Sequence, residues 1–135
     1  METLEDLQIE EKIQNTLESK SPFVDIVFGP DGRSQKFVPL SDDNKNMYIA
    51  SYPMSEDMKF HIKVATKGVE NFKAKGIKDI GGMEWGGGYL KKEGDQITYG
   101  GKSSQLKGEW DQSKVEETLH KAFPDMKLVF DSYLK

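Results

Sequence analysis

A glycine-rich hairpin and the polar loop that follows it carry the residues best suited to chemistry in this chain. Three consecutive glycines, residues 86–88, open an expected strand, and the returning strand leads into Gly101, Lys102, Ser103 and Ser104. Glycine at a strand opening lets another group approach the backbone closely. The loop offers backbone N–H groups, two hydroxyls and an ammonium, which together can cradle a phosphate or another oxyanion.

One of the two histidines, His61, lies on an expected helix that leads into this region. Imidazole titrates near neutral pH, so His61 can accept a proton from water while the loop holds a charged phosphoryl group. Phosphoryl transfer depends more on positioning and charge stabilisation than on covalent machinery. The alternative is that His61 caps or packs the helix, because it lies close to the expected buried stripe that contains Met58 and Ala65.

The second histidine and the cysteine count bear on metals. His120 lies near the C-terminal end of a second expected helix, where a partial positive charge is favourable. Two distant histidines without any cysteine give little support to a transition-metal site, so we expect neither metal nor cofactor. The absence of cysteine also excludes disulfides and fits an intracellular protein.

The charge balance argues against nucleic acid as a partner. The net charge is −4, and Arg33 is the only arginine among 19 basic residues. An anion site must therefore use lysine, hydroxyls and backbone. No apolar run approaches the ~20 residues that span a bilayer, and the acidic N-terminus has no apolar signal core. We expect a cytoplasmic monomer that binds neither nucleic acid nor membrane.

The hydrophobic periodicity predicts a single α+β domain, with a mixed sheet flanked by two main helices. One helix is expected from a cap at Ser55 to residue 75, and another from a cap at Asp111 or Ser113 to residue 123. The final helix and strand favour a crossover connection. Pro39 suggests a sheet edge or a strand end. The expected strands are residues 23–28, 35–40, 47–51, 77–80, 89–93, 96–100 and 126–130.

An amphipathic helix is expected before this domain. Leu7, Ile13 and Leu17 recur at roughly helical spacing among acidic residues and amides. We therefore divide the chain into an N-terminal helix or extension, residues 1–20, and a domain, residues 21–135.

Four short motifs follow one another in the second half of the chain. They are Phe60-His61, the glycines 86–88, Tyr99-Gly100 with the Ser103-Ser104 loop, and Phe123-Pro124-Asp125 before the last strand. In their order and approximate spacing they resemble the Janus/Ocnus family, which includes the small protein-histidine phosphatases. The resemblance covers about half of the chain.

The resemblance implies a metal-independent phosphatase that acts on phosphohistidine in proteins. His61 would activate water or attack phosphorus itself. The loop of Gly101, Lys102, Ser103 and Ser104 would hold the phosphoryl oxygens. A phosphorylated protein is then the implied partner.

The chain departs from the family pattern in three respects. The usual Gly-Tyr-Ser after the strand is here Gly101-Lys102-Ser103-Ser104. The family has arginine directly after the three glycines, where this chain has Tyr89, and a lysine on the first strand, where residues 23–28 have none. These departures leave open a non-catalytic relative that binds a phosphorylated or acidic partner without turnover. A third alternative is a regulatory domain that docks a partner through its N-terminal helix.

Overall fold

The structure is a computed structural model, and it describes residues 18–81, 86–104, 106 and 108–135. Most of the expected N-terminal helix falls on residues 1–17 and therefore lies outside the described part of the chain. The division of the chain at residue 20 stays a prediction.

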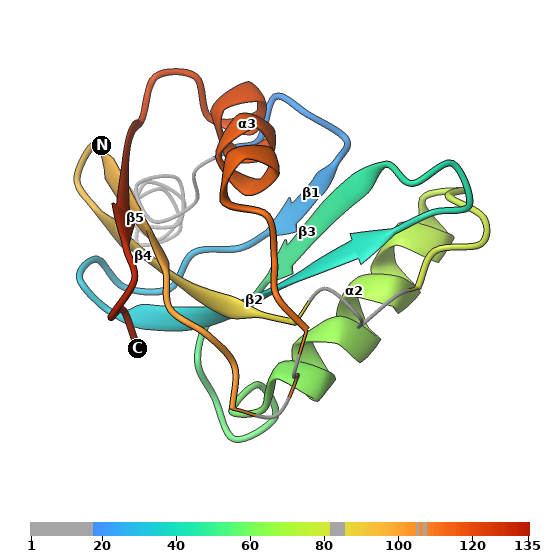
Figure 1. Cartoon of the computed structure of the whole chain (residues 1–135), viewed down its shortest axis with the longest axis horizontal. Helices are drawn as coiled ribbons and strands as arrows, with labels where there is room; N and C mark the ends of the chain where they lie inside the picture. Colours follow the sequence, from blue (N-terminus) through green and yellow to red (C-terminus); the bar gives the residue numbers. More distant parts are fainter. Residues whose placement is uncertain (1–17, 82–85, 105, 107) are drawn as a thin grey trace, which may run out of the picture.

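A mixed sheet of six strands forms the centre of the described structure (Figure 1). The strands lie in the order β1-β3-β2-β4-β5-β6. The two outer pairs are parallel, and the three inner pairs are antiparallel. The expected α+β fold with a mixed sheet is thereby confirmed. The strands are β1 Val24–Ile26, β2 Ser34–Ser41, β3 Met47–Ser51, β4 Gly88–Glu93, β5 Gln96–Gly100 and β6 Lys127–Asp131.

Two helices, α2 (His61–Ala74) and α3 (Gln112–Ala122), pack on opposite faces of this sheet. Successive side chains of a strand point to opposite faces. Phe37 of β2 accordingly packs in the apolar cluster that contains α3, whereas its neighbour Val38 packs in the cluster that contains α2. The sheet therefore separates two apolar layers, each closed by one helix.

The second helix forms the expected crossover. α3 begins after Asp111, whose Oδ1 accepts a hydrogen bond from the Lys114 amide at 3.1 Å. This cap satisfies one of the backbone donors that a helix start leaves without an intrahelical partner. The helix then leads into β6, which lies parallel to β5.

The first helix begins later than the sequence pattern indicates. Ser55 caps only a single turn, in which its Oγ accepts a hydrogen bond from the Met58 amide at 3.2 Å. The helix itself starts at His61, with Phe60 as an N-cap that makes no side-chain hydrogen bond. His61 is therefore the first helical residue, at the end of the helix nearest the glycines.

One expected strand is absent, and one of the two alternatives for Pro39, the sheet edge, is wrong. Residues 77–80 form no strand, and only Gly81 pairs with Ser41 in an isolated bridge. Pro39 lies in β2, which is an inner strand and not an edge. Its partner Ile49 directs its amide to the Phe23 carbonyl, so the proline nitrogen faces away from β3. On that side β4 pairs only as far as Phe37, so the missing N–H of proline interrupts no strand pairing.

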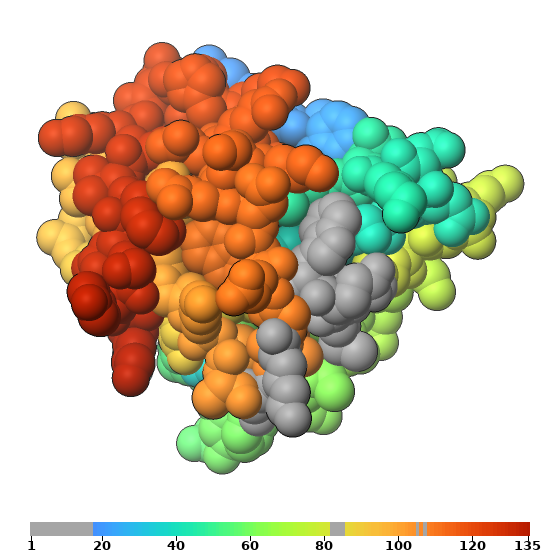
Figure 2. All heavy atoms as spheres, viewed as in Figure 1, coloured from blue at the N-terminus to red at the C-terminus, as the bar shows by residue number. Residues whose placement is uncertain are grey.

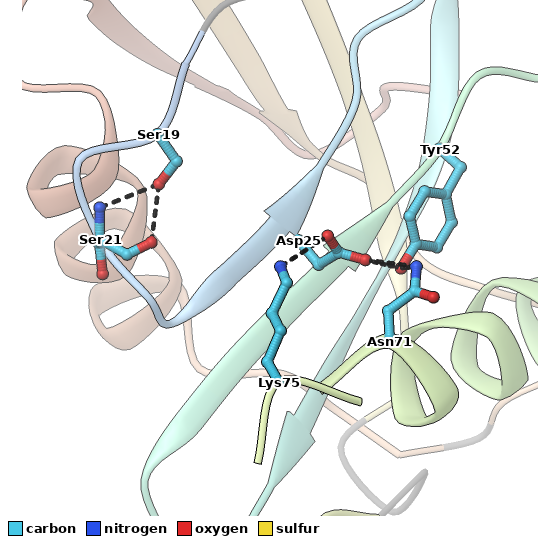
Figure 3. A network of polar contacts seen from close by, with 6 residues as sticks. All are labelled: Ser19, Ser21, Asp25, Tyr52, Asn71 and Lys75. Carbon is cyan, nitrogen blue, oxygen red and sulfur yellow. Dashed lines mark hydrogen bonds and ion pairs between the residues drawn. The ribbon is translucent and has the colours of Figure 1, made fainter. Parts of the chain in front are cut away.

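A polar network ties β1 to the C-terminal half of α2 (Figure 3). The Asp25 carboxylate accepts a hydrogen bond from the Tyr52 hydroxyl and another from Asn71 Nδ2 at 2.8 Å. Lys75 Nζ lies 3.1 Å from its other oxygen. Burial acts to raise the pKa of Asp25, but these three donors outweigh it and hold the pKa below its ordinary value. Burial and the Asp25 carboxylate raise the pKa of Tyr52, which keeps its hydroxyl a donor.

Asp25→Asn should destabilise the fold, because it removes the charge that Tyr52, Asn71 and Lys75 surround. We expect the free energy of unfolding in urea at neutral pH to fall by about 1–3 kcal/mol, the range for hydrogen bonds to charged groups. The exposed Asp57 provides the control, and Asp57→Asn should change stability by less than about 0.5 kcal/mol.

The effect of Asp25→Asn should depend on pH. The pKa of Asp25 is lowered by folding, so its contribution is present above the unfolded pKa of ~3.9 and is lost as pH falls through the folded pKa. The difference in stability between the wild type and the variant should therefore shrink below about pH 4. A difference that stays constant down to about pH 2 would contradict this account.

Candidate functional site

The His61 side chain is buried against the backbone of the glycine-rich segment. Its exposed fraction is 1%, and its Nε2 lies 2.8 Å from the Gly88 carbonyl oxygen. The Tyr89 ring meets it edge to face, with the two ring centroids 5.2 Å apart. The sequence left open whether this histidine packs or reacts, and the packing is evident.

The hydrogen bond to Gly88 fixes which nitrogen of His61 is basic. A carbonyl oxygen can only accept, so Nε2 donates and carries the proton. In the neutral ring the lone pair then lies on Nδ1, the nitrogen that would take a proton or attack phosphorus. A backbone carbonyl thus sets the tautomer of the one candidate base.

The surroundings of His61 also favour its neutral form. Burial lowers the pKa of the imidazole, and the nearby charge of Lys36 lowers it further. The hydrogen bond to the Gly88 carbonyl acts in the opposite direction but does not offset burial. A neutral imidazole at physiological pH is the state that general-base or nucleophilic chemistry requires.

The glycines are necessary because there is no space for side chains beside this ring. A Cβ at Gly87 would lie 2.6 Å from His61 Cδ2 and 3.0 Å from the Phe37 carbonyl oxygen. A Cβ at Gly88 would lie 2.6 Å from the Gly100 carbonyl oxygen. The glycines therefore let the His61 ring approach their backbone closely, as the sequence predicts.

The loop after β5 meets the same glycines. The Ser103 amide donates a hydrogen bond to the Gly87 carbonyl oxygen at 2.8 Å, one residue before the carbonyl that His61 contacts. Ser103 Oγ accepts a hydrogen bond from the Leu106 amide at 3.1 Å. Ser103 therefore fastens the loop to the glycines, and its amide is not available to hold an anion in this arrangement.

Gly101 sets the path by which the loop leaves β5. Its φ of +70° lies in the left-handed region that glycine adopts readily. A Cβ there would lie 2.0 Å from the Leu134 carbonyl oxygen. Trp110 Nε1 donates to the Gly101 carbonyl oxygen at 3.2 Å. The C-terminal segment and Trp110 thus hold the start of the loop in place.

The remaining two predicted cradle residues lie on the surface. Lys102 Nζ is 3.4 Å from Glu109 Oε1, and both side chains are well exposed. Such a surface ion pair is weak, so an anionic ligand can compete for the lysine. Ser104 is exposed and takes part in no hydrogen bond among the described residues. These residues can turn to a phosphoryl group, but the structure does not direct them at His61.

Lys36 is a residue near the site that the sequence analysis does not select. It lies on β2 directly opposite Tyr89 on β4, and its Nζ is 5.5 Å from the centroid of the Tyr89 ring. Burial lowers the pKa of this half-buried lysine. The one available signal is a lysine between Gln35 and Phe37, in the middle of a strand whose neighbouring residues are buried.

The described residues outside this site form neither a metal centre nor a membrane-spanning helix. Across the described ranges, no group of three or more His, Cys, Asp or Glu residues is arranged to hold a metal ion. None of the helices described is long and apolar enough to cross a membrane. His120 is exposed on α3.

Comparison with known proteins adds no family. No protein-family model matches the chain, and no curated protein matches it. The functional argument therefore depends on the geometry around His61 and on the motifs in the sequence.

Gly87→Ala tests the close contact between His61 and the backbone. The added methyl would overlap the imidazole, so we expect the free energy of unfolding to fall by about 1–3 kcal/mol, as for other overpacked sites. The His61 ring resonances should move with it in an NMR spectrum. Gly81→Ala is the matched control, because a Cβ at Gly81 meets nothing within 4 Å. Equal stability of the two variants would show that the contact is looser than described.

Proposed function

We propose that this protein is a metal-independent phosphohistidine phosphatase of the Janus/Ocnus type, with His61 as its base or nucleophile. One observation carries the proposal. The His61 ring contacts the Gly88 carbonyl, and the Ser103 amide binds the adjacent Gly87 carbonyl. The imidazole and the candidate phosphate loop are therefore held by neighbouring residues of one segment. Such a reaction needs a base and groups that bind the phosphoryl oxygens at one place, and the exposed Lys102 and Ser104 of this loop would supply those groups.

Two chemical routes fit this arrangement. In the first, a water oxygen forms a P–O bond and His61 Nδ1 takes a proton of the water. The P–N bond of phosphohistidine breaks, and the leaving imidazole nitrogen keeps its electron pair and takes a proton from solvent. In the second, Nδ1 itself bonds to phosphorus, the substrate imidazole leaves and takes a proton from solvent, and water then releases phosphate. Both routes need the neutral ring and the Nε2–H tautomer that the Gly88 carbonyl favours.

Lys36 supplies the cation that the family resemblance leads one to expect. The family lysine lies on the first strand, and β1 has none, but Lys36 on β2 lies close enough to His61 to lower its pKa. A half-buried ammonium there can balance the charge of a phosphoryl group. Tyr89 stands in the place of the family arginine and lies between Lys36 and His61.

The burial of His61 favours a second candidate. With only 1% of the residue exposed, a phosphoryl group can reach Nδ1 only when the segments around the ring move apart. A relative that has lost turnover could keep the same loop and bind a phosphorylated or acidic partner. Hydrolysis and binding therefore have to be measured separately.

His61→Gln is the most direct test, with His120→Gln as the matched control on the opposite helix. Glutamine keeps an N–H donor but has no basic nitrogen, so hydrolysis of a phosphohistidine peptide should fall by about 100-fold or more. His120 is exposed on α3, and its variant should keep the wild-type rate.

Unfolding curves of both variants, recorded beside the phosphate-release assay, separate loss of chemistry from loss of fold. A folded His61→Gln protein with the wild-type rate contradicts the proposed role. Wild-type protein that shows no hydrolysis, but whose amide resonances at residues 101–104 shift with the phosphopeptide, supports the binding candidate in its place.

The pH profile gives an independent test. The pKa of His61 is lowered, so activity should persist at pH 6.5 and be lost only at lower pH, as the ring becomes protonated. Lys36→Met removes a charge that lowers this pKa, so the acid limb should move to higher pH. The exposed Lys73, as Lys73→Met, should leave the limb in place. An acid limb that is identical in all three proteins contradicts the proposed coupling.

A further inference from the structure

A hollow lies between α3 and two loops, away from His61. It is lined by residues of the 21–23 loop, of the 45–47 turn and of α3. In Figure 2 the three segments, coloured blue, green-blue and orange, meet at the upper right of α3. His61 lies instead at the other end of the molecule, at the first turn of α2. From this hollow we infer a binding site for a small aromatic phosphate.

Among the described residues that line the hollow, lysines outnumber carboxylates, although the whole chain is acidic. Lys45, Lys114 and Lys121 line it, against the single carboxylate of Glu117. Lys121 Nζ pairs with Glu117 at 2.9 Å, but both side chains are about two-thirds exposed. Such a pair contributes little to stability, so a phosphate can recruit the lysine.

Lys114 and Lys121 reach the hollow because they share one side of α3. They are seven residues apart, which is two turns of helix, and Thr118 lies between them on the same side. Glu109 and Asp111 line the neighbouring hollow together with Lys114. These carboxylates limit how much negative charge the site accepts, which favours a single phosphoryl group over a polyphosphate.

Lys45 is presented by a backbone conformation that lysine rarely adopts. Its φ is +62°, in the left-handed region, at a cost of roughly 1–2 kcal/mol for a residue with a Cβ. Asp42 holds the turn, because its Oδ1 accepts hydrogen bonds from the amides of Asn44 and Asn46, each at 3.0 Å. A lysine kept where glycine or asparagine would fit better points to a use for its ammonium.

The apolar part of the hollow favours a ligand that carries an aromatic ring. Phe23, which is 37% exposed, and Met47 line it beside the lysines. Phe23 is held by the ring of Tyr48, with the centroids 5.1 Å apart. The hollow has a volume of about 240 Å³, below the ~300–1,000 Å³ of sites for drug-sized ligands. One ring and one phosphoryl group therefore describe the ligand class.

The test uses phenylphosphonate, which has no ester bond to hydrolyse, and follows amide resonances of the full chain by NMR. We expect saturable shifts at residues 21 and 23, at 45–47 and at 114–121. Inorganic phosphate and benzyl alcohol each carry half of the ligand. Each should bind with an affinity at least about tenfold lower than that of phenylphosphonate. Shifts confined to residues 101–104, or equal affinity for inorganic phosphate, would overturn the inference.

Lys45→Gly provides a sharp variant, because glycine accepts the left-handed conformation and the substitution removes the side chain that carries the ammonium. It should fold at least as well as the wild type and bind phenylphosphonate about tenfold more weakly, the effect of one charge-assisted hydrogen bond. Lys63→Gly would disturb a helix, so Lys63→Gln on α2 serves as the charge-matched control and should bind normally. Unchanged affinity in Lys45→Gly would overturn the site. Neither result depends on phosphatase activity.

Discussion

The packing of the His61 ring directly on a backbone without side chains is the constraint on which the rest of this structure depends. Gly87 has no side chain, and a Cβ at this position would lie only 2.6 Å from His61 Cδ2. The imidazole can therefore reach the Gly88 carbonyl, which fixes the tautomer. The same segment offers the Gly87 carbonyl to Ser103, so one short stretch of backbone orients both the histidine and the loop.

The sheet determines which other groups reach this place. The antiparallel register of β2 and β4 sets Lys36 opposite Tyr89, whose ring contacts His61. The α2 helix approaches closely because Gly68 lies over Ala50, where a Cβ would be only 2.5 Å from the alanine methyl group. The Asp25 network holds the far end of the same helix to β1. His61 is thus fixed at the start of a helix that is anchored along its length.

Much of the fold follows from the sequence, because apolar alternation and turn residues act locally. The β4-β5 hairpin around Gly94 is as predicted, and of the two predicted caps of α3, Asp111 and Ser113, the structure has Asp111. The start of α2 is not, because Ser55 makes a cap that serves only one turn. Pro39 does not mark a sheet edge, because the position at which β4 ends along β2 depends on the register between distant strands.

The residues of the candidate site are also only partly predictable from the sequence. The sequence indicates His61, the glycines and the loop, because these residue types have few local uses. The sequence does not indicate Lys36, because only the pairing of β2 with β4 brings this lysine close to His61. Ser103 looks like a phosphate ligand in the sequence, whereas its amide binds Gly87. Residue type suggests chemistry, but the direction of each N–H depends on contacts between distant segments.

The tautomer of His61 and its response to a phosphoryl ligand test the central claim most directly. Long-range proton–nitrogen NMR spectra of histidine-labelled protein report which ring nitrogen carries the proton. The account predicts a neutral ring at pH 7 with the proton on Nε2, and a change in the Nδ1 resonance when a phosphoryl analogue binds. A ring protonated on Nδ1, or an Nδ1 resonance that no phosphoryl analogue moves, would contradict it.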